Sequence, residues 1–161
     1  MVNEQMFKQV MAQWASGVSV VTTVSDTGWT GITVSSFNSV SLRPPLVSIC
    51  IATNLYTHDV IQQAGVFAVN VLSEGQIEVG KRFAGMYPDV EDRFADMKIQ
   101  TAETGCPILP DVMGWVDCRL WQEYPGGDHT IFVGEVVSGG IHAEAQEPLL
   151  YFNRKWGRFE G

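Results

Sequence analysis

The chain has 161 residues, of which 45% are hydrophobic and 17% charged, and this composition is typical of a folded domain rather than a disordered one. Ten Lys and Arg against eighteen Asp and Glu give a net charge of −8, and no run of basic residues is present to neutralise the phosphates of a nucleic acid. No apolar run approaches membrane-spanning length, so we expect one cytoplasmic domain, residues 1–161, with no membrane or nucleic-acid partner.

The first predicted element is an amphipathic helix from Asn3 to Trp14, with Asn3 as its N-cap and Gly17 ending it. Its apolar residues recur at helical spacing, and we expect it to pack on a sheet. The β-branched segment Val18 to Ser25 predicts a strand, followed by a hairpin turn at 26–28.

The segment Gly31 to Ala52, GITVSSFNSVSLRPPLVSICIA, begins as an alternating strand and continues into a polar loop, Ser36 to Ser41. The Pro44-Pro45 pair predicts an extended entry into a second strand, Leu46 to Ile51, and keeps the loop outside the sheet. The amides and hydroxyls of such a loop can contact a flat polar ligand, with Phe37 and Val40 as an apolar wall. Serine-rich loops are more often simple turns, so both interpretations stand.

A short helix follows this segment. Thr57 is a plausible N-cap and Asp59 lies in the first turn, so the start of the helix is a candidate anion site, with His58 expected in solvent. Val66 to Leu72 predicts a buried strand, and residues 76–84 a helix that carries Lys81 and Arg82 at its end. These two cations either complement the helix dipole or bind a phosphate.

The second half of the chain is rich in short strands. Residues 87–104 predict a surface excursion, and strands are expected at 115–121, in the second part of 127–137, and at 149–152. The residues EYPGG are expected to form a loop, and the last nine residues a tail. Many short strands with few helices predict a mainly β domain and a closed barrel rather than a parallel sheet.

Chemistry-bearing motifs are few. There is no Gly-rich dinucleotide fingerprint, no nucleophile elbow and no zinc spacing, and Cys50, Cys106 and Cys118 are far apart, so we expect neither a metal nor a disulfide. The triplet Gly127-Asp128-His129 precedes a buried strand. A lone histidine at a strand edge is more often structural than functional.

Several of these motifs, in this order, resemble the small flavin reductases, the NAD(P)H:flavin oxidoreductase components of two-component monooxygenases. The resemblance rests on the opening MFKQVMAQWASGVSVVTT, the Gly-x-Thr strand and Ser-Phe-x-Ser-Val-Ser loop between Gly31 and Val47, GDHT followed by Phe-x-Gly-Glu-Val, and LLYFNRKW near the end. It implies the FMN-binding split β-barrel, a Greek-key barrel with a few flanking helices, assembled as a homodimer. It also implies FMN or FAD as cofactor and NADH or NADPH as hydride donor.

The resemblance further implies a site. The flavin ribityl chain, phosphate and ring edge would contact the strand and loop residues Thr33, Ser35, Ser36, Asn38, Ser39, Val40 and Ser41. The backbone of Cys50, Ile51 and Ala52 would face the ring. The phosphate side would comprise Thr53, Asn54, Thr57, Arg82 and Phe83. The nicotinamide side would comprise the catalytic residue His129 together with Asp128, Tyr151, Lys155 and Trp156.

The function implied is hydride transfer from NAD(P)H to flavin, which supplies a partner monooxygenase with reduced flavin. The cofactors carry such chemistry, so a catalytic triad is not expected. Two alternatives keep the fold: a reductase of ferric iron or a corrinoid, and a flavin-binding electron carrier without its own NAD(P)H turnover. An intact GDHT motif favours the enzyme, because a carrier has no need to position a nicotinamide.

Overall fold

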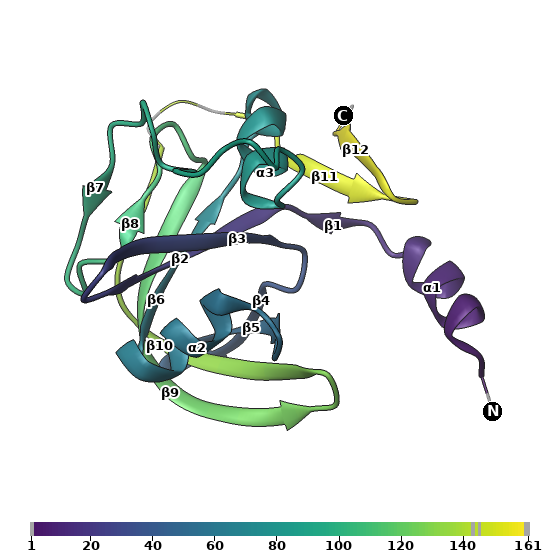
Figure 1. Cartoon of the computed structure of the whole chain (residues 1–161), viewed down its shortest axis with the longest axis horizontal. Helices are drawn as coiled ribbons and strands as arrows, with labels where there is room; N and C mark the ends of the chain where they lie inside the picture. Colours follow the sequence, from purple (N-terminus) through teal and green to yellow (C-terminus); the bar gives the residue numbers. More distant parts are fainter. Residues whose placement is uncertain (1, 143, 145, 160–161) are drawn as a thin grey trace.

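The chain folds around a curled antiparallel sheet of seven strands, in the order β3-β2-β6-β9-β10-β5-β4 (Figure 1). The computed structural model describes residues 2–142, 144 and 146–159. The strands of this sheet are β2 (Ser19–Ser25), β3 (Gly28–Val34), β4 (Asn38–Leu42), β5 (Pro45–Ala52), β6 (Val66–Val71), β9 (Gly114–Gly126) and β10 (His129–Ile141). The predicted mainly β class is confirmed.

Two small sheets complete the strands. One has the order β1-β11-β12 and the other pairs β7 with β8. Their bounds are β1 (Ser16–Gly17), β7 (Gln100–Thr101), β8 (Pro107–Ile108), β11 (Leu149–Phe152) and β12 (Lys155–Arg158). The expected tail therefore contributes a strand, β12, that pairs with β11 from Leu149↔Arg158 to Phe152↔Lys155.

The expected closed barrel is wrong, because the seven-stranded sheet is split. Its edge strands β3 and β4 do not pair with each other in the described part of the chain. Only the three residues 35–37 separate the end of β3 at Val34 from the start of β4 at Asn38. Four residue steps span at most about 14 Å, so the two edges approach each other at this end without forming a ladder.

The segment predicted as a loop outside the sheet is partly a strand, which corrects the expectation from Pro44-Pro45. β4 pairs with β5 from Asn38↔Ser48 to Leu42↔Pro45, with an irregularity between Ser39 and Ser41. The prolines lie in the turn and at the first position of β5, where a missing N–H costs no ladder bond. The donors of Asn38–Leu42 are therefore free to pair at the edge of the sheet.

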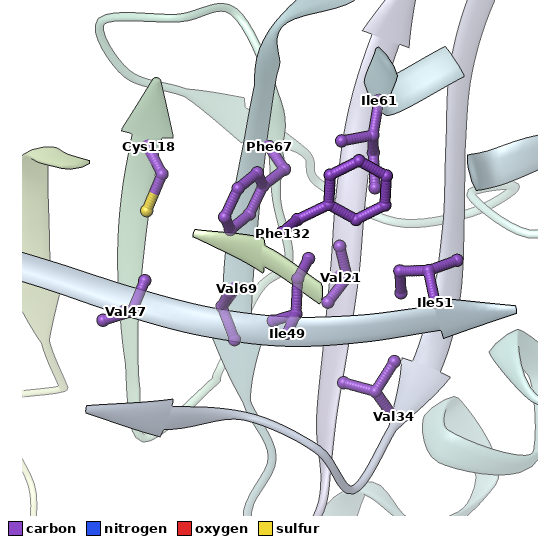
Figure 2. Close-up of a cluster of buried hydrophobic side chains, with 10 residues drawn as sticks. All are labelled: Val21, Val34, Val47, Ile49, Ile51, Ile61, Phe67, Val69, Cys118 and Phe132. Atoms are coloured by element: carbon purple, nitrogen blue, oxygen red, sulfur yellow. The ribbon is translucent and has the colours of Figure 1, made fainter. Parts of the chain in front are cut away.

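The inner face of the curled sheet encloses the main core (Figure 2). Phe67 and Phe132 are fully buried there, and Ile61 closes the core from helix α2 (Tyr56–Ala64). The remaining members are aliphatic side chains and a thiol: Val21, Val34, Val47, Ile49, Ile51, Val69 and Cys118. Burial in this core raises the pKa of Cys118 to about 12, so the thiol remains neutral and acts as a small apolar group.

The outer face of the same strands is also covered. Val20, next to Val21 on β2, belongs to a second cluster with Leu72, Leu149 and Phe83 of helix α3 (Ile77–Phe83). Successive strand residues point to opposite faces, and coverage of both faces accounts for the uninterrupted buried runs at 19–23 in β2 and 67–70 in β6. A short 3₁₀-helix, η1 (Glu74–Gln76), leads into α3.

Helix α1 (Glu4–Ala12) does not pack on the sheet as expected. It buries none of its residues, and Figure 1 shows it standing away from the body of the molecule. The Asn3 side chain caps it, accepting a hydrogen bond from Met6 N at 2.7 Å, but the helix ends at Ala12 and Gly17 lies in β1. No helix in the described residues is long and apolar enough to cross a membrane.

The first four residues of EYPGG extend β9 instead of forming a loop. Pairing with β10 continues to Gly126↔His129, so only Gly127 and Asp128 form the turn. Gly127 has a φ of 77°, a left-handed value that a residue with a side chain rarely adopts. The turn therefore presents Asp128 and His129 at the tip of a long hairpin.

Candidate active site

The link between β3 and β4 is fastened to the strand opposite it. Ser36 Oγ accepts a hydrogen bond from Cys50 N at 3.0 Å and donates one to Cys50 O at 3.2 Å. On β3, Thr33 Oγ1 donates to Gly80 O of α3 at 2.7 Å. Ser36 of the link therefore lies beside Cys50 of β5, whereas the Thr33 hydroxyl is directed to α3.

The ends of β5 and β10 form the next part of the site. Ala52 pairs with His129, and the following residue, Thr53, donates from both N (3.0 Å) and Oγ1 (3.2 Å) to Asp128 O. These bonds join the predicted ring and phosphate segment to the predicted nicotinamide turn, although 75 residues separate Thr53 from Asp128.

His129 is held by its neighbour. Its Nδ1 lies 2.7 Å from Asp128 Oδ1, and both side chains are accessible. The hydrogen bond from His129, and secondly the charge of a protonated imidazole, lower the pKa of the Asp128 carboxyl, which is ionised at neutral pH. An ionised carboxylate only accepts, so Nδ1 carries a proton, and in the neutral form of the ring Nε2 is left as an acceptor.

A cavity of about 460 Å³ opens beside this segment, between β3, the start of α2, the end of α3 and the chain after it. Thr57 and Phe83, both predicted site residues, line it. Gly31 forms part of its wall, where a Cβ would lie 3.1 Å from the Phe83 ring, so glycine is needed for this close packing. The other lining residues are Trp29, Thr30, Ile32, Leu55, Tyr56, Ala84, Glu91, Asp92, Arg93 and Phe94.

The cavity offers groups that suit a phosphorylated aromatic ligand. Arg93 Nη1 donates to Gly31 O and Phe83 O, both at 3.2 Å, which fixes the guanidinium at the wall. Leu55, the N-cap residue of α2, gives no side-chain cap, so the amides before His58, whose own N–H donates to Leu55 O at 3.0 Å, can face an anion. Thr30 and Thr57 add hydroxyls, 3.3 Å apart. The residues present therefore fit a flavin phosphate.

Arg93 is the main residue that the sequence analysis missed. Arg82, the predicted counter-charge, is directed elsewhere: its Nη1 donates to Ala95 O at 3.2 Å, and it does not line the cavity. One feature of the sequence could have pointed to Arg93: the tripeptide Arg-Phe-Ala occurs at both 82–84 and 93–95. The two phenylalanines of these tripeptides are in edge-to-face contact at 5.0 Å, so the second copy folds back over the first.

Two expectations for the start of α2 are wrong. Thr57 is a buried residue of the first turn rather than the N-cap, which is Leu55. His58 is not in solvent but only 6% exposed, with its ring 5.3 Å from that of Phe132. Both side chains face inward because α2 lies across the mouth of the curled sheet.

The remaining loop residues occupy the edge of the sheet. Asn38 Nδ2 donates to Ser36 O at 2.9 Å, and Ser41 Oγ accepts from Arg43 N at 3.3 Å. Ser35, Ser39, Val40 and Asn54 are exposed. Ile51 is 1% exposed with its side chain in the core, so only its backbone is available to a ligand, as the prediction assumed.

Tyr151 and Trp156 lie apart from the His129 turn within the chain. Their rings meet at 5.6 Å in the β11–β12 hairpin, and Trp156 packs on Gly80, where a Cβ would lie only 2.8 Å from the indole. Lys155, on the same hairpin, is exposed. Figure 1 shows this hairpin and the tip of β9–β10 at different sides of the molecule. The structure thus brings Ser36, Cys50, Ala52 and Thr53 together with Asp128 and His129, but neither Arg82 nor the whole nicotinamide set.

Comparison with known proteins decides the family. The profile of the flavin reductase like domain matches residues 11–160. The chain belongs to the flavin reductase family. It is 36% identical to a flavin reductase of Pseudomonas putida over 98% of this chain and 91% of that one. It is 34% identical to the reductase subunit HsaB of a flavin-dependent monooxygenase of Mycobacterium tuberculosis, over 94% and 80% of the two chains.

The fold agrees with solved members of the family. The NADH:FAD oxidoreductase SgcE6 of Streptomyces globisporus superposes with a TM-score of 0.91 and 33% identity, covering 100% of this chain and 98% of that one. The split-barrel fold implied by the sequence motifs is therefore confirmed. The described residues contain no group of three or more His, Cys, Asp or Glu side chains able to hold a metal ion.

Proposed function

We propose that this flavin reductase family member transfers hydride from NAD(P)H to a bound flavin and supplies reduced flavin to a partner flavin-dependent monooxygenase. The observation that carries the proposal is the pair of hydrogen bonds from Thr53 to Asp128 O, which fasten the His129 turn to the segment that opens onto the cavity. The monooxygenase partner is proposed because HsaB is a monooxygenase subunit. The three cysteines are unpaired, which fits a reducing cytoplasm.

The flavin would be held by three parts of the chain. Arg93, the first turn of α2 and the Thr57 hydroxyl would hold the phosphate, with Arg93 rather than Arg82 as the counter-charge. The link and β4, from Ser35 to Ser41, would border the ribityl chain and ring. Backbone amides at Cys50 to Ala52 would stabilise negative charge at the edge of the ring.

A second hollow favours FAD over FMN. Strand β3 runs from the proposed ring side at Thr33 to Trp29, a distance of about 13 Å at ~3.3 Å per residue. Trp29 and Phe94, in edge contact at 5.8 Å, border both the first cavity and an adjoining hollow of about 550 Å³ that Lys98 also lines. Aromatic faces with a cation nearby suit an adenylate, the part of FAD that FMN lacks.

The chemistry requires position more than acid–base catalysis. When bound, the flavin supplies the acceptor for the hydride. The protein's own part is to hold Asp128 and His129 beside that acceptor, with Nε2 free to accept a hydrogen bond from the nicotinamide carboxamide. The Asp128 carboxylate keeps this tautomer in place. No protein group has to give or take a proton in the hydride step.

We also propose a homodimer in which a second copy of the chain covers α1. Met6, Phe7, Val10, Met11 and Trp14 are 49% to 73% exposed, and no other part of the described subunit covers them. A contiguous apolar helix face of this kind marks an interface. A second subunit would also supply the missing neighbours of the His129 turn, including a second pair of Tyr151 and Trp156 side chains.

Anaerobic titration of flavin-loaded protein with NADH and, in parallel, NADPH tests the proposal. We expect the flavin absorbance to bleach, and His129→Ala to lower kcat/KM for the nicotinamide by about ten- to a hundredfold, because a displacement of about 1 Å costs on that order. Flavin affinity should change only a few-fold. Bleaching by neither donor would leave the electron carrier, and turnover only with ferric or corrinoid acceptors would leave the alternative reductase.

A further inference from the structure

The buried histidine at the start of α2 is fully hydrogen-bonded. His58 Nδ1 lies 3.0 Å from Asp59 Oδ1, and Nε2 lies 2.9 Å from Thr130 Oγ1. Asp59 is at the surface, whereas Thr130 is only 8% exposed. The Asp59 carboxylate accepts from Nδ1–H, so Nε2 of the neutral ring accepts from the Thr130 hydroxyl. Through its bond to Thr130, the His58 ring therefore fixes the separation of α2 and β10.

The path ends beside the active-site turn. Thr130 directly follows His129 on β10, and Asp128, which directly precedes it, is bound through its carbonyl by Thr53. His129 therefore lies between two tied residues. Both ties come from the six residues 53–58, which also carry Leu55 to Thr57 of the cavity wall.

We propose that His58 is a positioning residue for hydride transfer: through Thr130 it fixes the backbone that carries His129 relative to the flavin cavity. The inference rests on the proposed function, because it assigns His58 a part in that same reaction. Thr53 and His58 then hold the turn from both sides of His129, and we call this pair of contacts the clamp. A ligand bound at Thr57 stiffens the segment that makes both contacts.

A nucleophilic role for the same three side chains does not fit the structure. The order carboxylate, imidazole, hydroxyl in Asp59, His58 and Thr130 is that of a hydrolase triad. The Thr130 hydroxyl is buried, however, and neither Thr130 nor His58 lines the cavity. No substrate atom can reach the hydroxyl, so the group orients the backbone and does not react.

His58→Phe tests the inference, because phenylalanine keeps the packing on Phe132 and removes both ring nitrogens. With FAD bound and NADH in excess, the anaerobic single-turnover rate of flavin reduction should fall about tenfold, the order expected for a small displacement of the turn. The FAD dissociation constant should stay within a few-fold. Amide hydrogen exchange should rise at 127–131, which is a readout independent of turnover.

The decisive comparison repeats the substitution in a His129→Ala background. A residue that acts through His129 has nothing left to position there, so His58→Phe should cause no further loss of rate. Thr130→Val should reproduce the effect, the double variant His58→Phe/Thr130→Val should lose no more than either single change, and Thr130→Ser, which keeps the hydroxyl, should retain the rate.

An unchanged rate in His58→Phe, or the same loss with and without His129, overturns the inference. If His58→Phe does not fold, the matched pair Thr130→Val and Thr130→Ser decides the question in the same two backgrounds. Failure of the wild-type protein to reduce either FAD or FMN with NADH or NADPH would instead overturn the proposed function, and the hydrogen-exchange result at 127–131 would still report whether His58 fixes this segment.

Discussion

Helices α1 and α2 have the same length and a similar amphipathic pattern, yet they occupy opposite environments. Each has nine residues. Helix α2 buries Thr57, His58, Val60 and Ile61 across the mouth of the sheet, whereas α1 buries none of its residues. The helical spacing of apolar residues therefore predicts that one face of a helix will be covered. It does not identify what covers that face. For α2 the cover is the core of its own subunit, and for α1 we propose a second subunit.

The largest expected effect contrasts matched core and surface truncations in the two helices. Ile61→Ala removes a fully buried side chain and should lower the free energy of unfolding by about 2–5 kcal/mol. Val10→Ala removes a side chain that is 60% exposed and should change it by less than about 0.5 kcal/mol within the subunit. Urea denaturation over a range of protein concentrations measures both. Equal losses would show that α1 belongs to the same folding unit as α2.

The next largest effect is expected on binding of the flavin phosphate at the start of α2. Arg93→Ala should weaken FMN binding by about 1–3 kcal/mol while riboflavin binding changes little, because only FMN carries the phosphate. Arg82→Ala is the matched control and should have the smaller effect. Fluorescence titration gives the four dissociation constants. A larger loss for Arg82→Ala, or equal loss for both ligands, would assign Arg93 a structural role.

A charge on α1 should act on association. Val10→Asp places a carboxylate in the proposed interface and should raise the dissociation constant of the dimer at least about tenfold, equivalent to about 1.4 kcal/mol. Sedimentation equilibrium measures it, and Gln9→Asp, a change at another exposed position of the same helix, provides the comparison. A protein that is monomeric at all concentrations, or a dimer insensitive to Val10→Asp, would remove α1 from the interface.

The smallest effect is expected on the stability of α1 when its N-cap is removed. Asn3→Ala removes the acceptor for Met6 N and should cost the helix about 1 kcal/mol. Amide exchange in 4–12 should accelerate, while the Tm of the monomeric subunit should stay unchanged because α1 contributes nothing buried to it. A lower Tm of the monomer would show that α1 supports the barrel.

Much of the fold could be predicted because local chemistry determined it. The strand expected at Val66–Leu72 is observed as Val66–Val71, since β-branched residues and a following turn signal specify it locally. Burial of His58 could not be predicted in this way, because it depends on Thr130, a partner 72 residues away. Pairing of β4 was missed for a related reason. A proline removes a backbone donor only at its own position, and here these positions are the turn and the first residue of β5.

The candidate site likewise has a part that local motifs predicted and a part that they missed. The motif from Gly31 to Val47 and the GDHT turn indicated the residues that lie together around Cys50, Thr53 and His129. Arg93 was missed because its place in the wall arises from the chain folding back after α3, and no periodic pattern marks such a return. Local patterns therefore predicted which segments lie together but not which cation lines the cavity.

The three-residue connection between the edge strands also bears on how fast a ligand can leave. Because residues 35–37 hold the two edges near each other, and Ser36 is bound to both N and O of Cys50, the gap can widen only at its far end, near Gly28 and Leu42. Strands β3 and β4 can then move apart by pivoting about Ser36, but not by separating in parallel. We therefore expect the residence time of the proposed flavin to depend on the length of this connection, and a short insertion among residues 35–37 should speed its exchange.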